Sequence, residues 1–305
     1  MTPQVVVIGD ALIDEVRDGR GVREFVGGAA LNVAVGLARL GVPATLIAMV
    51  GDDEAGAHIR EYLSDFGVEL VATSAPYGSS RAVSTRSGGG EPVYEFNEAA
   101  KARRIRFGAA EHTAMTDAAM VVVSCFPFDD IAQTRELAEA VEAVRAPLVV
   151  DPNPRTGMLA DRAEFVRGFE ELAGGAALVK VGEDDARLLY GEPLDALRAR
   201  LIDLGAGAVL ATQGADGATI ETGDDVVTRP VSDLPGRIVD TMGAGDAALA
   251  ATVAELLQGL PRDADAWGAV LQRAMDVAAA TCRFEGALLR LPSAVEGMDL
   301  DRLGT

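Results

Sequence analysis

A run of small residues lies between two aspartates where an apolar helical pattern begins: Asp240, Gly243, Ala244, Gly245 and Asp246. The first N–H groups of a helix have no internal acceptor and carry partial positive charge, and small residues let a bulky anion approach them. A carboxylate beside such an anion is unfavourable unless it reacts, for instance by taking a proton from an attacking hydroxyl. Taken alone, the stretch is better explained by a glycine turn that starts a helix.

Polar residues also follow strands expected elsewhere in the chain. Asp14 lies just beyond the first strand, and Asn32 lies near the start of the next helix, which Gly28 opens. Asn153 and Arg155 follow a later buried strand at alternate positions, so their side chains can converge on one site. Open α/β sheets bind ligands at the carboxyl ends of their strands, and carboxylate and amide groups suit sugar hydroxyls. A turn acid and a local cap are the structural alternatives for Asp14 and Asn32.

The familiar nucleotide-binding motifs are absent from the sequence. Neither lysine, Lys101 or Lys180, belongs to a Gly-x-x-x-x-Gly-Lys-[Ser/Thr] motif, and no Gly-x-Gly-x-x-Gly follows the first strand. A P-loop NTPase and a conventional dinucleotide enzyme are therefore poorly supported. Thr212, Gly214 and Gly217 lie at a strand end and a tight turn, which by themselves predict only a hairpin.

The composition narrows the classes of function further. The formal net charge of −20 over 305 residues disfavours nucleic acid and anionic membranes as partners, because the field of the protein repels polyanions. The sequence has only two histidines and two cysteines, which disfavours a Ser-His-Asp triad and a His-based metal cluster. No apolar run is long enough to span a bilayer, and the N-terminus has no signal-peptide pattern, so we expect a cytoplasmic globular protein.

Hydrophobic runs of strand length alternate with amphipathic windows along the chain. Strands are predicted at 5–8, 44–50, 68–71, 120–124, 148–151, 178–181, 208–212, 218–222 and 226–230. Helices are predicted at 30–40, 54–66, 131–144, 163–172, 183–190, 194–204, 244–258 and 264–283. This alternation predicts one α/β domain over residues 1–305, built on a parallel, doubly wound sheet with helices on both faces.

Two segments, about 14–25 and 78–107, interrupt the alternation with short β-type patterns and turn residues. We interpret them as a small antiparallel sheet that projects from the main domain and acts as a lid, which would exclude water during chemistry. Two ordinary surface hairpins are the alternative. Arg81, Arg86 and Arg104 lie in the second segment and could meet an acidic ligand group, although solvated charges are the better explanation.

The stretch DTMGAGD at 240–246 resembles the C-terminal signature of the PfkB or ribokinase-like carbohydrate kinases, and GGAALNVAVGLARLG at 27–41 resembles their N-terminal Gly-Gly and Asn pattern. The likeness covers essentially the whole chain and is closest to bacterial fructokinases. It implies a Rossmann-like three-layer α/β/α sandwich with a small β-sheet lid. It also implies transfer of the γ-phosphoryl group of ATP, with Mg²⁺, to a sugar hydroxyl.

The resemblance assigns roles to individual residues. Asp246 matches the catalytic base, and the anion hole comprises Gly243, Ala244 and Gly245. The sugar-binding positions are Asp14, Gly28 and Asn32, to which the stretch DPNPR adds Asn153 and Arg155. The nucleotide side comprises Lys180, Thr212, Gly214, Gly217 and Ala279. Asp185 matches an acid tied to Mg²⁺, and Asp240 matches a position linked to a monovalent cation, commonly K⁺.

The chain departs from the family pattern at two positions. Gly182 stands where Asn is usual near the Mg²⁺ and phosphate groups, and Ala279 stands where Asn is common beside adenine. Fructose is the favoured acceptor. Ribose, 2-keto-3-deoxygluconate and a nucleoside are alternatives, as is a non-catalytic sugar- or nucleotide-binding protein on the same fold. The resemblance also suggests a homodimer formed through the lid edges.

Overall fold

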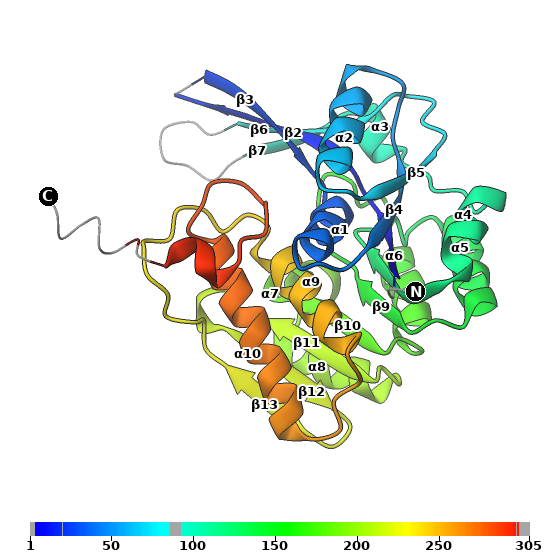
Figure 1. The fold of residues 1–305 in the computed structure, drawn as a ribbon. Helices are drawn as coiled ribbons and strands as arrows, with labels where there is room; N and C mark the ends of the chain where they lie inside the picture. Colours follow the sequence, from blue (N-terminus) through cyan, green and yellow to red (C-terminus); the bar gives the residue numbers. More distant parts are fainter. Residues whose placement is uncertain (1–3, 20, 86–92, 297, 299–305) are drawn as a thin grey trace, which may run out of the picture.

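The computed structural model describes residues 4–19, 21–85, 93–296 and 298 of the 305-residue chain. The strands of its large sheet are β1 (Gln4–Gly9), β4 (Ala44–Met49), β5 (Glu69–Thr73), β8 (Ala118–Ser124), β9 (Leu148–Asp151), β10 (Leu178–Gly182), β11 (Ala208–Thr212), β12 (Ala218–Thr222) and β13 (Val226–Arg229). They lie in the order β13-β12-β11-β10-β9-β8-β1-β4-β5 (Figure 1).

The strands from β5 to β11 in this order run parallel, whereas β12 and β13 pair antiparallel at one edge. The parallel sheet predicted from the alternation therefore ends at β11, and the hairpin signal at 212–217 marks its antiparallel edge, because short turns join β11 to β12 and β12 to β13 and leave no room for a crossover helix. Parallel strands bring their carboxyl ends to one side of the sheet, which is where an open α/β sheet binds ligands.

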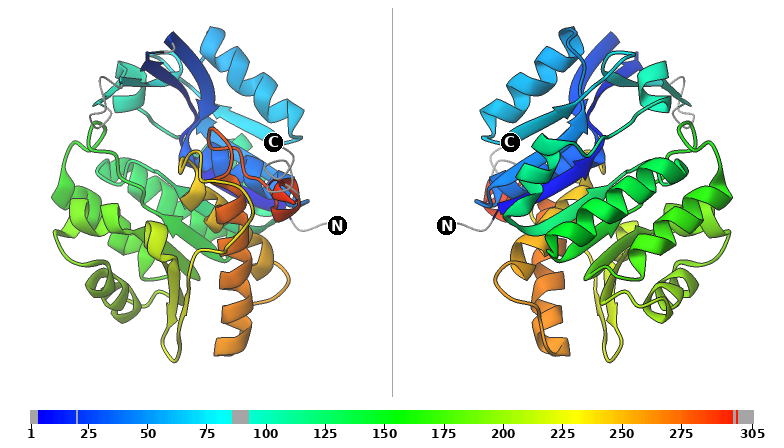
Figure 2. Two further views of the ribbon diagram at one scale, coloured as in Figure 1. Left: turned by 90° about the vertical axis from the view of Figure 1, so that its left-hand side faces the viewer. Right: turned by 90° about the vertical axis from the view of Figure 1, so that its right-hand side faces the viewer.

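Helices cover both faces of the large sheet (Figures 1 and 2). One face packs against α1 (Ala29–Arg39), α2 (Glu54–Asp65), α9 (Ala244–Leu256) and α10 (Ala264–Thr281), and the other packs against α4 (Ala109–Thr116), α5 (Ile131–Val144), α6 (Arg162–Ala173) and α8 (Leu194–Asp203). Along β1, Val5 and Val7 join the first core, and Val6 and Ile8 join the second. The predicted three-layer α/β/α architecture is confirmed.

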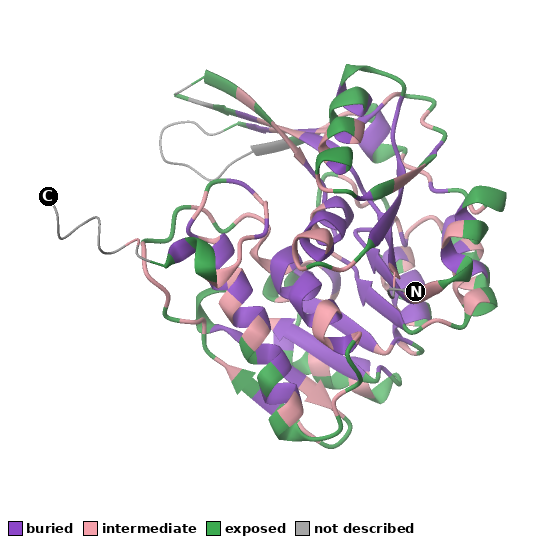
Figure 3. Ribbon diagram, in the orientation of Figure 1, coloured by how far each residue is buried: buried purple, intermediate pink, exposed green. Residues whose placement is uncertain are grey.

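The small sheet has the order β3-β2-β6-β7 and projects beside the carboxyl ends of the large one (Figures 1 and 3). Its strands are β2 (Leu12–Asp18), β3 (Gly21–Gly27), β6 (Ser80–Thr85) and β7 (Val93–Phe96), so each predicted insertion supplies two strands. The two hairpins are antiparallel, but β2 and β6 pair in parallel, and the prediction of an antiparallel sheet is wrong at that junction. Arg86 lies outside the described residues.

Several short elements escaped the hydrophobic pattern. They are α3 (Glu98–Lys101), α4, and the 3₁₀ turns at Gly214–Asp216 and Pro292–Val295. The helix predicted at 183–190 is a single α-turn, α7 (Glu183–Asp185), followed by a π-helical turn over Ala186–Tyr190. None of the described helices is long and apolar enough to cross a membrane.

Candidate active site

A buried ion pair lies at the carboxyl edge of the large sheet. The Nζ of Lys180, on β10, donates to Oδ1 of Asp151 at 3.1 Å, and the hydroxyl of Ser124 donates to Oδ2 of the same carboxylate at 2.9 Å. All three side chains are buried. Burial by itself lowers the pKa of Lys180. The neighbouring carboxylates, Asp151 first among them, raise that pKa by more than burial lowers it, so the ammonium stays charged. The sequence pointed to Lys180 but not to this pairing.

Helix α9 begins beside this ammonium group. Gly243 adopts the left-handed conformation, with φ 73°, directly before the helix, and a Cβ there would lie 2.6 Å from the Cα of Ala287. Within the described residues, the N–H groups of Gly245 and Asp246 have no hydrogen-bond acceptor. The Nζ of Lys180 lies 3.4 Å from the point that a Cβ of Gly245 would occupy. Free N–H groups next to an ammonium suit a phosphate group.

Asp246 lies in the first turn of α9, and only 8 % of its surface is exposed. Its Oδ2 accepts a hydrogen bond of 2.8 Å from Nδ2 of Asn32 on α1. Burial raises the pKa of Asp246 to about 6, while the bond from Asn32 and the charge of Lys180 hold it down. A carboxylate with a pKa just below neutrality is an effective general base at neutral pH. The two sequence motifs, 27–41 and 240–246, thus meet at a single hydrogen bond.

Asp14 lies on β2 and faces the next strand of the small sheet. A Cβ on Gly27 would collide with its Oδ2, so the glycine makes room for the carboxylate. Burial, followed by the charge of Asp10, raises the pKa of Asp14 to about 7, and Arg155 opposes the rise. The charge of Asp246 acts on Asp14 in the same sense as that of Asp10. The predicted sugar-binding carboxylate therefore lies within electrostatic range of the candidate base.

The start of α1 is held by Asp10, an acid just beyond the first strand to which the sequence motifs assigned no role. Asp10 follows β1, and its Oδ1 accepts from the N–H of Ala30 at 3.0 Å. Gly28 caps the helix, and its carbonyl accepts from the N–H of Asn32 at 2.8 Å. These two bonds fix the backbone that carries Asn32 to Asp246.

The residues after β9 approach the same carboxylates. Asn153 adopts a left-handed backbone conformation, with φ 38°, and its side chain has no hydrogen-bond partner among the described residues. Arg155 is exposed at its side chain, and the charges of Asp246, Asp10 and Asp185 act on it. The assignment of Asn153 and Arg155 to the acceptor site stays a prediction.

Asp240 ties together the two loops that flank the start of α9. Its Oδ1 accepts from the N–H of Met242 at 3.0 Å, and its Oδ2 accepts from the N–H of Gly286 at 3.1 Å. A neighbouring side chain missed by the sequence analysis, Arg283, donates to three backbone carbonyls, those of Leu234, Pro235 and Ala279. An arginine directly after the end of a helix was the available signal. Together these contacts hold the loop that leads into the candidate anion hole.

Asp185 is buried and accepts from the N–H of Gly182 at 2.6 Å. Burial raises its pKa to about 6, and Lys180 opposes that rise. In the described part of the chain, no three His, Cys, Asp or Glu side chains group to hold a metal ion by themselves. Mg²⁺ commonly needs only one or two carboxylates when phosphates and water supply its other ligands, and Asp185 fits that requirement.

The residues predicted for the nucleotide side divide into two groups. Thr212 ends β11, and the turn after it needs glycine at Gly217, where a Cβ would collide with the carbonyl of Arg229. Gly214 is exposed at this turn and open to a ligand. Ala279, in contrast, is only 1 % exposed inside α10, and its carbonyl is bonded to Arg283. Thus Ala279 presents no surface to a nucleotide in this conformation.

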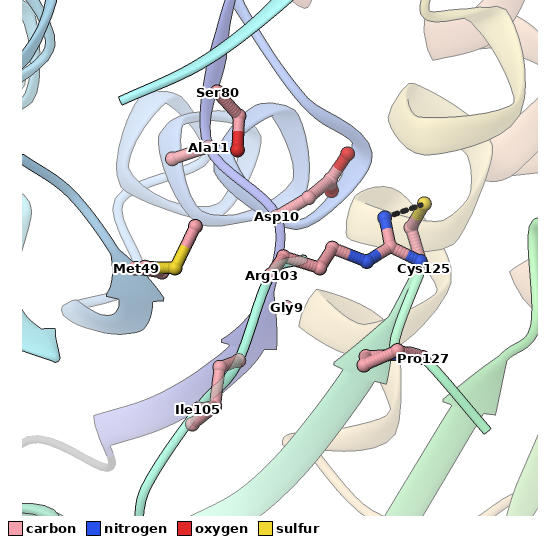
Figure 4. Close-up of a pocket in the computed structure, with 9 residues that line it drawn as sticks. All are labelled: Gly9, Asp10, Ala11, Met49, Ser80, Arg103, Ile105, Cys125 and Pro127. Carbon is pink, nitrogen blue, oxygen red and sulfur yellow. Dashed lines mark hydrogen bonds between the residues drawn. The ribbon is translucent and has the colours of Figure 1, made fainter. Parts of the chain in front are cut away.

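A pocket opens next to these residues, between the ends of β1, β4 and β8 and the start of β6 (Figure 4). Its lining comprises Gly9, Asp10, Ala11, Met49, Ser80, Arg103, Ile105, Cys125 and Pro127. Apart from Asp10 and Arg103, these residues carry no formal charge. Arg103 was not among the candidate residues, because nothing in a run of basic residues distinguishes the one that faces inward.

The profile described as "pfkB family carbohydrate kinase" matches residues 2–294. The chain belongs to this family. The predicted family and ribokinase-like fold are confirmed, and with them the class of enzyme, a phosphotransferase that acts on alcohol groups. The alternative of a non-catalytic binding protein is therefore set aside.

Relatives of known name support this membership and differ in their acceptors. A "Fructokinase" from Rhizobium leguminosarum bv. trifolii is 29 % identical over 262 residues, covering 83 % of this chain and 79 % of that protein. An "Aminoimidazole riboside kinase" from Salmonella typhimurium (strain LT2) is 30 % identical over 258 residues, covering 80 % and 78 %. Among solved structures, a fructokinase from Xylella fastidiosa with bound ATP has a TM-score of 0.82 at 20 % identity, over 99 % of this chain and 100 % of that one.

Proposed function

We propose that this carbohydrate kinase transfers the γ-phosphoryl group of ATP to a hydroxyl of a small ketose, with fructose as the reference acceptor. The observation that carries the proposal is the start of α9. There a buried carboxylate, Asp246, adjoins the ammonium of Lys180 and two N–H groups that have no acceptor among the residues the structure describes. A base, an anion hole and a cation at one helix start are the parts that phosphoryl transfer requires.

The proposed reaction uses these groups in a fixed order. The acceptor hydroxyl lies against Asp246, held by Asn32 in the orientation seen here. As its oxygen forms a bond to the γ-phosphorus, the bond from that phosphorus to the β,γ-bridging oxygen breaks and ADP leaves. The hydroxyl proton passes to Asp246. The N–H groups of Gly245 and Asp246 stabilise the charge on the transferred group, and Lys180 adds positive charge.

Other predicted residues take supporting roles in the proposal. Asp14 and Asn153 bind acceptor hydroxyls, and Arg155 lies beside the transferred group. Mg²⁺ would neutralise charge on the ATP phosphates, and the carboxylate of Asp185 would be its ligand from the protein. Asp240 and the loop at Gly286 are the candidate site for K⁺, which would support the anion hole. Thr212 and Gly214 lie at the edge of the proposed nucleotide site.

We further propose that residues 1–305 form one kinase domain and that the small sheet is its lid. Strand β3 leads directly into Gly28 and α1, so a movement of the sheet would reach Asn32. Lid closure would exclude water from the transferred group. A homodimer through the lid edges and a cytoplasmic location stay predictions. Size-exclusion chromatography with light scattering tests the dimer.

A panel of acceptors tests the proposed function. Release of ADP from MgATP is followed by a coupled assay with fructose, ribose, 2-keto-3-deoxygluconate and adenosine. We expect fructose to stimulate ADP release over the sugar-free rate. Stimulation by ribose or adenosine alone would replace the ketose with a pentose or nucleoside acceptor. No stimulation by any member of the panel would contradict the proposal.

A further inference from the structure

The arginines next to the site differ in how their charge is balanced. Arg104 contacts Glu136 at 2.9 Å, and Arg81 contacts Glu24 at 2.7 Å. The guanidinium of Arg103, in contrast, donates to Sγ of Cys125 at 3.4 Å (Figure 4). It also donates to Sδ of Met158 at 3.5 Å, and it makes no ion pair with a described residue. Thiol and thioether sulfur are weak acceptors. The half-buried charge of Arg103 is thus left with capacity for a stronger acceptor.

The backbone of this arginine is held in place on both sides. The buried side chain of Gln133 donates to the carbonyl of Arg103 at 3.2 Å and accepts from the N–H of Ile105 at 2.8 Å. The hydroxyl of Thr73 donates to the carbonyl of Arg104 at 3.1 Å. An arginine on such a pinned segment loses less freedom when it binds, which favours a recognition role over a solvated one.

The surroundings of Arg103 strengthen an interaction with an anion. Its pocket is lined by Ala11, Met49, Ile105 and Pro127, whose apolar surfaces exclude water. Charge pairs are stronger where water is excluded. The carboxylate of Asp10 is in the same pocket, but its Oδ1 is bonded to the N–H of Ala30. Asp10 is placed to accept from acceptor hydroxyls, and Arg103 is the group there that donates to an anion.

The pocket is close to the candidate base. Asp10 contacts α1 at Ala30, and Asn32, two residues further along the same helix, contacts Asp246. The charges of Asp10 and Asp246 also both act on Asp14 and on Arg155, so the two carboxylates lie within electrostatic range of the same pair of side chains. An acceptor with its reacting hydroxyl at Asp246 can therefore extend toward the pocket that Asp10 lines.

We infer that Arg103 is a specificity-determining residue that binds an acidic group, a carboxylate or a phosphate, on the end of the acceptor remote from the phosphorylated hydroxyl. The inference rests on the proposed function, and it changes the preferred acceptor from a neutral ketose to an acidic one. Fructose remains a usable substrate because the reacting end is the same. Guanidinium donors match the planar geometry of a carboxylate and also suit phosphate.

The test compares kcat/KM for three acceptors that differ at the remote end: fructose, 2-keto-3-deoxygluconate with a carboxylate, and fructose 1-phosphate with a phosphate. For the wild-type enzyme we expect at least one acidic acceptor to exceed fructose. In Arg103→Gln that acceptor should lose roughly tenfold or more, the usual effect of a lost hydrogen bond to a charged group, while fructose should change less than about threefold. Arg103→Lys keeps the positive charge, so its kcat/KM for the acidic acceptor should lie between the values of the wild type and of Arg103→Gln.

Arg104→Gln is the matched control, because it removes the neighbouring arginine whose charge is already balanced by Glu136. It should leave the ratio between acceptors unchanged. An equal loss for all three acceptors in Arg103→Gln, or the same ratio change in Arg104→Gln, would overturn the inference. So would a wild-type preference for fructose over both acidic acceptors.

A binding measurement separates this inference from the proposed reaction. Thermal shift without ATP is recorded with 2-keto-3-deoxygluconate and with fructose 1-phosphate. Stabilisation of the wild type that disappears in Arg103→Gln supports binding of an acidic group by Arg103. If no acceptor is phosphorylated in that case, only the proposed function fails. No stabilisation by either acid overturns the inference, whatever the result with fructose.

Discussion

At the scale of single residues, the site depends on the environment of one carboxylate. Asp246 is buried, which raises its pKa, and it is bonded to Asn32, which holds that pKa down. The balance leaves its pKa at about 6, where a base is ionised at neutral pH yet still able to take a proton. Asp246 would not have this pKa in a solvent-exposed turn.

The pH dependence of kcat follows from this balance. Asp246 acts as a base only when ionised, so kcat should fall as the pH drops through about 6 and should level off above it. In Asn32→Ala the hydrogen bond that lowers the pKa is gone, and the midpoint of the acidic limb should move to higher pH. A pH series of initial rates at saturating substrates measures both. An unmoved or lowered midpoint in the variant would show that another group controls the limb.

At the scale of elements, the start of α9 depends on a glycine. Gly243 combines a left-handed backbone with a contact that leaves no space for a Cβ beside Ala287. The loop before it is fixed through Asp240 and Gly286. The anion hole is thus a product of two loops and a helix, and not of the sequence DTMGAGD alone.

Gly243→Ala should therefore disturb both stability and catalysis. We expect a loss of roughly 1–3 kcal/mol in the free energy of unfolding, typical of a strained backbone position, and a fall in kcat larger than the change in KM. Chemical denaturation and steady-state kinetics measure these effects. Gly223→Ala is the control, since no neighbouring atom lies within 4 Å of a Cβ there. Equal behaviour of the two variants would contradict this account of Gly243.

The sequence predicted the elements better than the way they meet. Long periodic helices such as α5 and α10 were located to within a few residues, because their apolar faces repeat along the chain. The parallel pairing of β2 with β6 and the ion pair of Lys180 with Asp151 join residues far apart in sequence, and no local pattern encodes them. For the same reason the motifs indicated Asp246 and Asn32 but not their bond, and Arg103 was missed altogether.

At the scale of the whole molecule, the carboxylates of the site affect the stability of the fold. Burial raises the pKa of Asp14 to about 7 and those of Asp185 and Asp246 to about 6, from an ordinary value of 3.8. The folded chain therefore binds more protons than the unfolded chain between about pH 4 and pH 7. Stability must fall as the pH rises through this window.

We expect the ligand-free protein to melt at a higher temperature at about pH 5 than at about pH 7.5. Hydrogen bonds lower the pKa values of Asp53 and Asp130, so these two groups make stability rise with pH, but only below about pH 4. Differential scanning calorimetry measures the difference, which should shrink in Asp246→Asn. A melting temperature that rises steadily from pH 5 to pH 7.5 would contradict the burial of these ionisable groups.

The most direct test of the central claim is to follow the γ-phosphorus of ATP by ³¹P NMR with fructose or 2-keto-3-deoxygluconate present, for the wild type and for Asp246→Asn. We expect the wild type to convert it into a sugar phosphate ester with ADP as the other product. The variant, with sugar binding nearly unchanged, should form the ester roughly 10²–10⁴-fold more slowly. Release of inorganic phosphate with no sugar ester, or undiminished transfer by the variant, would contradict the account.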